Sequence, residues 1–216
     1  MKKTTICQIL LAIAIVIIIV LVVLKPLCCC KNSEESAPKT ATTTEIINDR
    51  EWKKIDPKEI QDNPVQLIAD DWLALAAGKE SDLNAMTIAW GTMGNLWGKP
   101  VVTVFVSPDR YTYEFMERNE YFTVTAFPET ERDKLQYIGS HSGRDGDKIK
   151  DAGLTVEYTD LGNPTFTDGR LMIECRKIYT EQFDSTRFND ETKARYRNGM
   201  GVHHYYIGEI VNVWVK

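Results

Sequence analysis

Outside its N-terminal segment the sequence has almost no cysteine and little histidine. Four of the five cysteines lie among the first thirty residues, so Cys175 is alone in the rest of the chain. A lone cysteine cannot form an internal disulfide, and a structural zinc site needs about four soft ligands held close together. The three histidines, His141, His203 and His204, do not have ligand-type spacing. The sequence therefore argues against a disulfide-stapled domain and against a metal site.

An excess of positive charge is also missing. The 216 residues carry 26 Lys and Arg against 31 Asp and Glu, a formal net charge of -5. No general positive field is present to attract a nucleic-acid backbone, so we expect no nucleic-acid partner. The chain also lacks G-x-G-x-x-G, since Gly91, Gly94 and Gly98 are wrongly spaced, and it has no β-α-β alternation. A nicotinamide, if it binds, does not use a Rossmann pocket.

The only long hydrophobic run lies at the N-terminus. Every residue from Ile9 to Leu24 is apolar, which approaches the ~20 residues that span a bilayer. We therefore expect residues 1–30 to form a transmembrane or signal-anchor helix, followed by a flexible polar tether over residues 31–45. Lysines on both sides of the run leave the side of the membrane open. Lipid attachment at Cys28, Cys29 or Cys30, cleavage of the segment, and unmodified thiols are alternatives that the sequence leaves open.

Residues 46–216 carry short strand patterns separated by Gly, Pro, Asn and Asp. A capped helical turn is expected at Asp56–Ile60. Strands are expected at Val65–Ala69, Trp72–Ala77, Ala85–Trp90, Val101–Val106, Tyr121–Ala126, Leu171–Tyr179 and Tyr205–Val215. Helical segments are expected at Thr112–Arg118, Thr130–Ser140 and Asp147–Ala152. Seven short strands without crossover helices predict a mainly β domain with a barrel core and short peripheral helices.

Two turns in this domain are suited to an anion. Arg110 and Thr112 stand where a strand passes into a helix, and a helix start with a nearby guanidinium can hold a phosphate. The alternative is a helix cap with a solvated Arg. In the second turn, Ser142, Arg144 and Lys148 surround flexible glycines that can form a backbone nest. Its alternative is an exposed turn held by ion pairs.

A third segment, Asn84–Gly91, is a strand with two different faces. Alternation places Met86, Ile88 and Trp90 on one face. The other face carries the small residues Ala85, Thr87 and Ala89, against which a flat ligand could lie. A core strand whose small face packs against another sheet is the alternative.

Taken in their order along the chain, the three segments resemble the flavin reductase-like family of FMN-binding split barrels, including the flavoredoxin type. The resemblance rests on Asn84, Met86, Thr87 and Trp90, then on Pro108, Arg110, Tyr111 and Thr112, then on Ser142, Gly143, Arg144, Asp145, Asp147 and Lys148. The strand Tyr206–Ile210, preceded by His203 and His204, resembles the family's closing strand. Ser107 departs from the pattern, because many relatives have an arginine there.

The resemblance implies a Greek-key split β-barrel that forms a homodimer and binds one FMN per subunit. It implies an enzyme that transfers hydride from NAD(P)H to FMN and on to an unknown acceptor, with NADH or NADPH left open. The alternative is a membrane-tethered FMN electron-transfer protein that a protein partner reduces. The implied cofactor-binding residues are Asn84, Ala85, Met86, Thr87, Ala89, Trp90, Arg110, Tyr111, Thr112, Ser142, Gly143, Arg144 and Lys148.

No catalytic side chain is required for hydride transfer. We expect Thr87 to lie nearest the reacting edge of the flavin, and His204 is a candidate for closing over the ring, with a simple strand cap as its alternative. The polar stretch Phe183–Gly201 is either a lid or a dimer arm.

Overall fold

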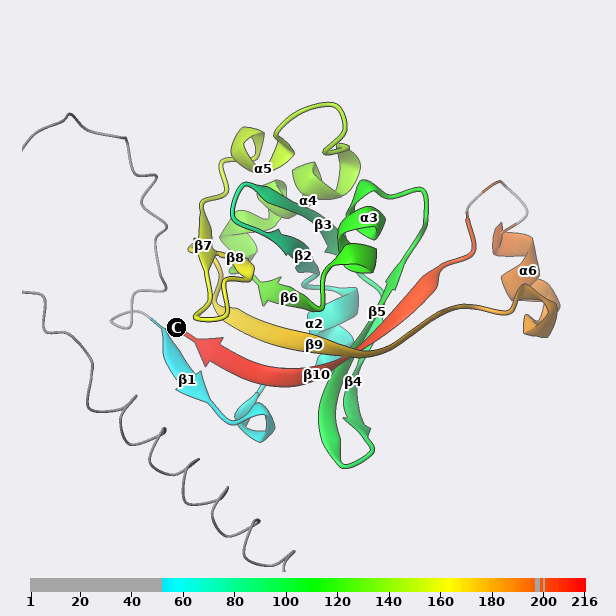
Figure 1. Cartoon of the computed structure of the whole chain (residues 1–216), viewed down its shortest axis with the longest axis horizontal. Helices are drawn as coiled ribbons and strands as arrows, with labels where there is room; N and C mark the ends of the chain where they lie inside the picture. Colours follow the sequence, from blue (N-terminus) through cyan, green and yellow to red (C-terminus); the bar gives the residue numbers. More distant parts are fainter. Residues whose placement is uncertain (1–51, 197–198, 200) are drawn as a thin grey trace, which may run out of the picture. The chain divides into compact units, whose positions relative to one another are not determined.

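The computed structural model describes residues 52–196, 199 and 201–216 (Figure 1). The expected membrane segment at 1–30 and the tether at 31–45 lie outside these residues and stay predictions. Across the described part of the chain, no helix is both long and apolar enough to cross a bilayer.

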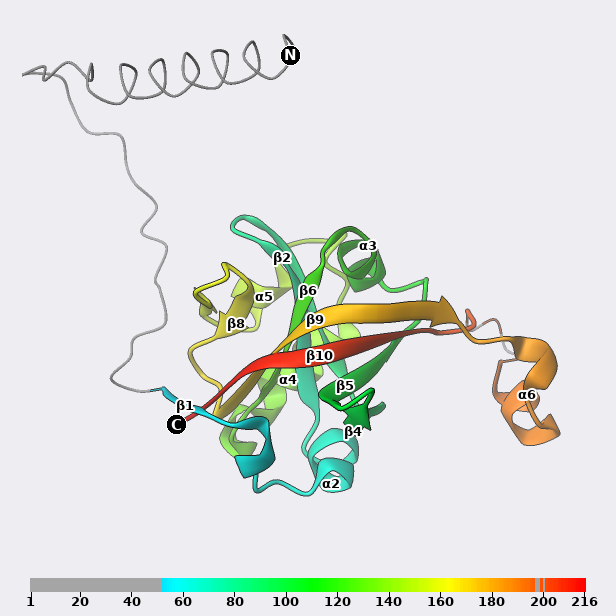
Figure 2. The same cartoon turned by 60° about the horizontal axis from the view of Figure 1, so that its bottom comes forward.

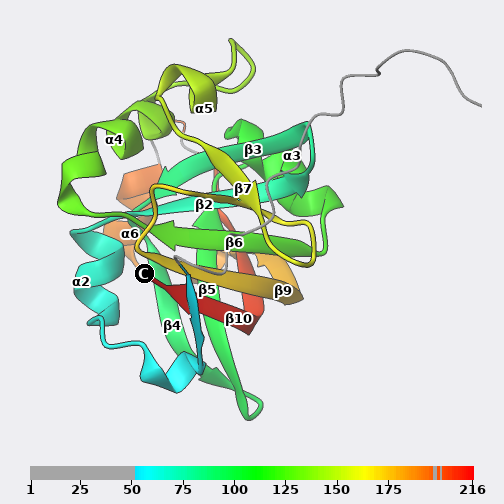
Figure 3. The same ribbon diagram turned by 90° about the vertical axis from the view of Figure 1, so that its left-hand side faces the viewer.

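One antiparallel sheet of eight strands forms the core of the domain. Seven strands follow one another in the order β3-β2-β6-β9-β10-β5-β4, and β1 pairs with the end of β10, at Val213–Val215, beyond the part that pairs with β5. Figure 3 shows this succession, with α4 and α5 beside β3. The strands are β1 (Lys53–Ile55), β2 (Leu73–Lys79), β3 (Asp82–Ile88), β4 (Gly91–Leu96), β5 (Lys99–Val106), β6 (Tyr121–Ala126), β9 (Leu171–Gln182) and β10 (His204–Val215). A separate pair, β7 (Val156–Tyr158) and β8 (Pro164–Phe166), completes the strands of the described residues.

Short helices cover this sheet, as the sequence predicts for a mainly β domain. They are α2 (Pro64–Ala69), α3 (Tyr111–Arg118), α4 (Arg132–Ser140), α5 (Lys148–Asp151) and α6 (Asp190–Tyr196), with single 3-10 turns η1 (Pro57–Glu59), η2 (Glu129–Glu131) and η3 (Ser185–Arg187). The helices expected at Thr112–Arg118, Thr130–Ser140 and Asp147–Ala152 are confirmed as α3, α4 and α5, with small differences at their ends. The turn expected at residue 56 is also confirmed, because Asp56 and Glu59 form a reciprocal capping box.

Strand β2 is buried on both faces and separates two apolar clusters. Leu73 and Leu75 pack into a cluster with α2, α3 and the strands β5, β6, β9 and β10. Ala74 and Ala76 pack on the other side, beneath α4 and α5. Small residues on this second face let the helices approach the sheet closely. The site described below lies where β3, the edge neighbour of β2, meets these helices.

The strand expected at Val65–Ala69 is wrong, because these residues belong to helix α2. Asn63 caps the helix by accepting hydrogen bonds from the backbone N–H groups of Val65 and Gln66, and Pro64 occupies a first-turn position. Leu67 and Ile68 are its buried residues. An apolar run this short fits both the 3.6-residue period of a helix and the two-residue period of a strand, so the capping residues decide between them.

Four strands are not expected from the sequence: β1, β4, β7 and β8. Three of them have only three residues, which is too short for a period of two to be visible. Strand β4 contains Gly91, Gly94 and Asn95, which are typical of turns, and it forms through pairing with β5. The strand expected to run to Trp90 ends at Ile88, since β4 begins at Gly91.

Gly208 shows how closely the barrel interior is packed. A Cβ atom at this position would lie 2.5 Å from Phe122 Cζ and 2.6 Å from Cys175 Cβ. We expect Gly208→Ala to lower the free energy of unfolding by about 1–3 kcal/mol, because strands β9 and β10 would have to separate. The thermal midpoint should fall by several degrees in calorimetry. Gly94→Ala is the matched control, since nothing lies within 4 Å of its Cβ position. Equal midpoints for both variants would contradict this packing.

Candidate functional site

The three sequence segments meet at Asn84. The Asn84 side-chain amide donates a hydrogen bond to Thr112 Oγ1 at 2.9 Å, and both residues are buried. A Cβ atom on Gly143 would lie 2.5 Å from Asn84 Oδ1 and 3.0 Å from Tyr111 Cδ1. The glycine loop therefore lies directly on the strand and on the start of α3. Only a residue without a side chain permits this approach.

A small cavity, the corner cavity, opens where these segments meet. Its volume is about 110 Å³. A water molecule takes roughly 30 Å³ of the liquid, so the corner cavity has room for a small anion. Its lining residues are Met86, Asp109, Arg110, Tyr111, Thr112, Ile138, Gly139, Ser140, His141, Ser142 and Lys148. Residues from the two anion-suited turns thus line one cavity although about thirty positions separate the turns in sequence.

Lys148 is the buried cation of the corner cavity. Its side chain is 6% exposed, and its ammonium donates to the carbonyls of Ile138 at 2.8 Å and His141 at 3.0 Å. Within the described residues it forms no ion pair. Desolvation, with a smaller contribution from the Arg110 charge, lowers the pKa of Lys148 to about 8. A buried ammonium without a carboxylate partner favours an anionic ligand beside it.

Arg110 stands at the N-cap of α3 and uses no side-chain hydrogen bond to cap it. Its guanidinium is exposed at the cavity wall, and no hydrogen bond or ion pair occupies it within the part of the chain that is described. The first turn of α3 adds the positive end of the helix dipole. The corner cavity therefore combines two cations with backbone donors, which is suited to a phosphate group.

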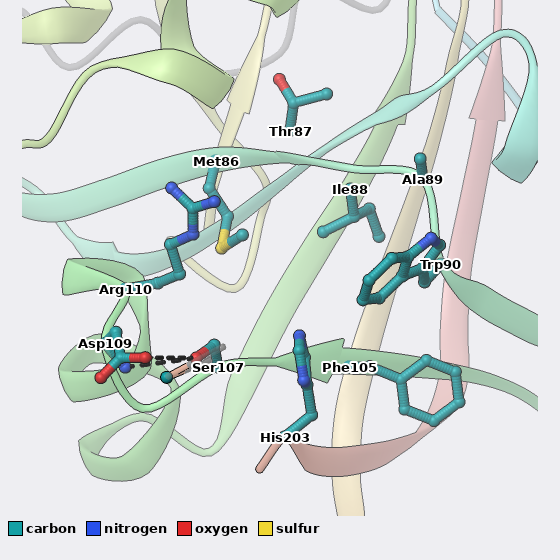
Figure 4. A pocket seen from close by; sticks show the side chains of 11 residues that line it. Met86, Thr87, Ile88, Ala89, Trp90, Phe105, Ser107, Asp109, Arg110 and His203 are labelled. Atoms are coloured by element: carbon teal, nitrogen blue, oxygen red, sulfur yellow. Dashed lines mark hydrogen bonds between the residues drawn. The ribbon is translucent and has the colours of Figure 1, made fainter. Parts of the chain in front are cut away.

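A larger pocket, the open pocket, adjoins the corner cavity and shares Met86, Asp109 and Arg110 with it (Figure 4). Its volume is about 480 Å³, within the range of small-molecule sites. The lining residues are Met86, Thr87, Ile88, Ala89, Trp90, Phe105, Ser107, Asp109, Arg110, Gly199 and His203. Figure 4 shows Met86 and Ile88 pointing from β3 towards the side of Phe105 and His203.

The face of β3 that carries the small residues is covered by helix α4, whereas the sequence pattern predicts that a flat ligand lies against it. Thr87 Oγ1 donates to the Leu135 carbonyl in α4, and a Cβ atom on Gly139 would lie 3.0 Å from Thr87 Cβ. Ala85 is fully buried in the cluster beneath the same helix. Helix α4 covers this face, so the side chains of Ala85 and Thr87 are not free for a ligand. The opposite face, with Met86 and Ile88, borders the open pocket.

Of the two adjacent histidines, His203 and not His204 lines the open pocket. His204 packs against Tyr113, with ring centroids 4.9 Å apart. His203 is buried, its ring lies 5.3 Å from that of Trp90, and its Nδ1 is 3.1 Å from Tyr196 Oη. Burial, and then the charge of Arg110, lower the pKa of His203, so the ring is neutral at neutral pH. His203 lies directly before β10, which begins at His204, and the two rings enter different surroundings.

Arg144 is the predicted anion ligand that the fold does not bring to the corner cavity. Its guanidinium pairs with Glu114 at 2.6 Å, donates to the Asp109 carbonyl at 3.2 Å and lies over the Tyr111 ring. The other predicted anion ligands, Arg110, Thr112, Ser142 and Lys148, line the corner cavity together.

Sequence reasoning missed Phe105, Ser107, Asp109 and His203 as pocket residues. Asp109 accepts hydrogen bonds from Ser107 Oγ at 3.1 Å and from the Gly201 N–H at 3.0 Å. These bonds hold the chain before β10 against the corner that carries Arg110. Pro108 and the polar residues around it mark this corner in the sequence, but their partner Gly201 is 92 residues away.

Comparison with known proteins agrees with this geometry. The family model described as "Flavin reductase like domain" matches residues 71–216. The fold is similar to that of flavoredoxin from Methanosarcina acetivorans, with 24% identity, 68% of each chain covered and a TM-score of 0.54. It is also similar to an FMN-binding domain of a flavin reductases-like enzyme from Shewanella baltica, with 17% identity, 76% of each chain covered and a TM-score of 0.55. These likenesses confirm the split-barrel fold.

A curated relative from Aeropyrum pernix, described as an uncharacterized protein, is 27% identical over 128 residues. The match covers 57% of this chain and 48% of the relative, so the chain spans about half the length of that protein.

The lowered pKa of Lys148 predicts how anion binding depends on pH. The ammonium is present below pH 8 and is lost above it, so affinity for an anion should fall as the pH rises through about 8. Sulfate is a suitable probe because its charge is constant over this range. We expect calorimetric titration of the ligand-free protein to show weaker sulfate binding at about pH 9 than at about pH 7. Arg144→Ala should keep this pH dependence and Lys148→Met should lose it; the same dependence in Lys148→Met would contradict the assignment.

Proposed function

Because this chain belongs to the flavin reductase-like family, we propose that it is an oxidoreductase that binds FMN and uses it to oxidise NAD(P)H. The observation that carries the proposal is the corner cavity, which opens beside a pocket of about 480 Å³ and holds the buried Lys148 and an Arg110 guanidinium that no partner in the described chain occupies. An anion site beside a mostly apolar pocket suits a ligand that joins a phosphate to a flat ring system.

The residues of the corner cavity fit the phosphate of FMN. Arg110 can donate two parallel hydrogen bonds to phosphate oxygens, and the Lys148 ammonium has a third donor beyond its two carbonyl partners. Thr112 and Ser142 contribute hydroxyl groups to the same wall. An anion in this place would also compensate the buried charge of Lys148, which no carboxylate of the described chain does.

Strand β3 fits the edge of the isoalloxazine ring through its backbone. Among the described strands it is the terminal one of the sheet and pairs only with β2. Alternate N–H and C=O groups on its other edge are therefore free of strand partners and can bond the polar edge of a heteroaromatic ring. The side chains of Met86 and Ile88 would then pack on the ring system. When bound, FMN supplies the two-electron chemistry of hydride transfer.

The remaining pocket residues shape the space where a nicotinamide would lie. Trp90, Phe105 and His203 form aromatic walls, and the lowered pKa of His203 favours its neutral form, while the charged Asp109 and Arg110 lie at the end shared with the corner cavity. Such walls exclude water and hold a flat ring in position, and hydride transfer needs little else from the protein. The homodimer, the electron acceptor and the attachment to a membrane stay predictions.

The phosphate assignment predicts that variants of the corner cavity distinguish FMN from riboflavin. Loss of one charge-assisted contact costs about 1.5–3 kcal/mol. Arg110→Ala and Lys148→Met should therefore weaken FMN binding roughly ten- to a hundredfold in fluorescence titrations. Riboflavin, which has no phosphate, should bind with nearly unchanged affinity. Arg144→Ala is the control, because Arg144 is already paired with Glu114. Equal losses for FMN and riboflavin would count against the assignment.

Anaerobic mixing tests the reaction itself. The FMN-loaded protein should lose its flavin absorbance rapidly when NADH or NADPH is added, because hydride transfer reduces the flavin. Stopped-flow absorbance gives the rate for each donor. If neither donor bleaches a fully loaded protein, the NAD(P)H reaction is refuted, and reduction by a protein partner takes its place.

A further inference from the structure

The chain between β9 and β10 forms an arm, defined here as Phe183–Tyr196. It contains η3 and α6, and Figures 1 and 2 show α6 beyond one end of the long strands β9 and β10, while β1 lies at their other end. The proposed function uses no residue of this arm.

Aromatic contacts fix the arm against the open pocket. The Phe183 ring lies 5.5 Å from Phe105 and 5.1 Å from Tyr205. The Phe183 N–H donates to the His203 carbonyl at 3.1 Å, and Tyr196 Oη reaches the His203 ring. His203 is thus a wall of the open pocket on one side and an attachment point of the arm on the other.

A second cavity, the arm cavity, lies between the arm and the sheet. The arm contributes Phe183, Thr192, Arg195 and Tyr196. Its other lining residues are Trp90, Phe105 and His203, which also line the open pocket. The two spaces are therefore neighbours across shared aromatic side chains. With about 240 Å³, the arm cavity is below the ~300–1,000 Å³ of whole-ligand sites, so it suits part of a ligand that extends from the open pocket.

Arg195 is the unpaired cation of the arm. Among the described arm residues, Arg187 pairs with Asp184 at 3.3 Å and Lys193 with Asp190 at 3.9 Å. Arg195 instead lies over the Trp90 ring, 5.9 Å from its centroid, and has neither an ion pair nor a hydrogen bond within the described chain. Its guanidinium is exposed at the mouth of the cavity and can bind an anion.

Aromatic walls and a free guanidinium together suit a flat ring that carries a phosphate. In a nicotinamide dinucleotide, a pyrophosphate links the nicotinamide riboside to adenosine. If the nicotinamide lies in the open pocket, the adenosine and its phosphates must therefore lie in a neighbouring space. We propose that the arm cavity binds the adenosine half of the nicotinamide dinucleotide and that Arg195 contacts one of its phosphates. The proposal rests on the proposed function, because it assumes a dinucleotide donor. The phosphate is either the 2′-phosphate of NADPH or the pyrophosphate that both donors share.

Binding of nicotinamide-free fragments tests the site without turnover. Calorimetry on the full-length, FMN-loaded protein would compare adenosine 2′,5′-bisphosphate, ADP and adenosine. Arg195→Ala should weaken binding of the phosphorylated fragments roughly tenfold and leave adenosine unchanged. If only adenosine 2′,5′-bisphosphate loses affinity, Arg195 contacts the 2′-phosphate. If both phosphorylated fragments lose affinity, Arg195 contacts the phosphates at the 5′ position. Arg187→Ala, on the same arm, should behave like the native protein. Native-like affinity in Arg195→Ala would overturn the proposal.

Steady-state kinetics separate this proposal from the proposed function. In Arg195→Ala the KM for NADPH, and for NADH if the pyrophosphate is the contact, should rise roughly tenfold with kcat unchanged. Reduced nicotinamide mononucleotide lacks the adenosine half, so its KM should not change. Equal KM values for the mononucleotide and both dinucleotides in the native protein would overturn the arm site while leaving the reductase activity intact. If no donor reduces the flavin, the proposed function fails, and the fragment titrations still decide whether Arg195 binds adenosine phosphates.

Discussion

The hydrogen bond from Asn84 to Thr112, with Gly143 pressed against the same amide, is the contact on which the site depends. It joins the edge strand, the start of α3 and the glycine loop, which are far apart in sequence. With the loop in this place, Lys148 at its end lies inside the domain, beside the N-terminus of α3. A side chain at position 143 would separate the three segments, and the corner cavity would lose its shape with them.

The buried Lys148 shows a conflict between stability and binding. Burial of the ammonium, and to a smaller extent the charge of Arg110, disfavours the charged form in the folded state, which is why the pKa of Lys148 falls to about 8. A bound anion reverses this effect, since it favours the charged form and stabilises only the folded protein. Folding and anion binding are therefore coupled through one side chain. A buried charge breaks the usual rules for a protein interior, and such exceptions are expected at functional sites. Lys148 is an exception of this kind.

Three neighbouring spaces follow the edge of the sheet from the corner cavity through the open pocket to the arm cavity. Cations stand at both ends, Arg110 with Lys148 at one and Arg195 at the other. The middle is lined largely by apolar and aromatic side chains and by His203, whose lowered pKa favours the neutral ring, while Asp109 and Arg110 lie where it meets the corner cavity. This distribution of charge suits flat rings in the centre and phosphates at the ends, which is the pattern expected of two nucleotide-like ligands that meet ring to ring.

The sequence by itself determined the local chemistry: the mainly β class, the Asp56 turn, and the pairing of glycines with cations in two turns that suit an anion. These features depend on residues within a few positions of one another, so a pattern can show them. Only the tertiary structure decided which side chains are free. Helix α4 covers Thr87, Glu114 occupies Arg144, and His203 rather than His204 faces the pocket. Each outcome depends on a partner 30 or more residues away or on which face of a strand is covered, and short-range periodicity carries no information about such partners.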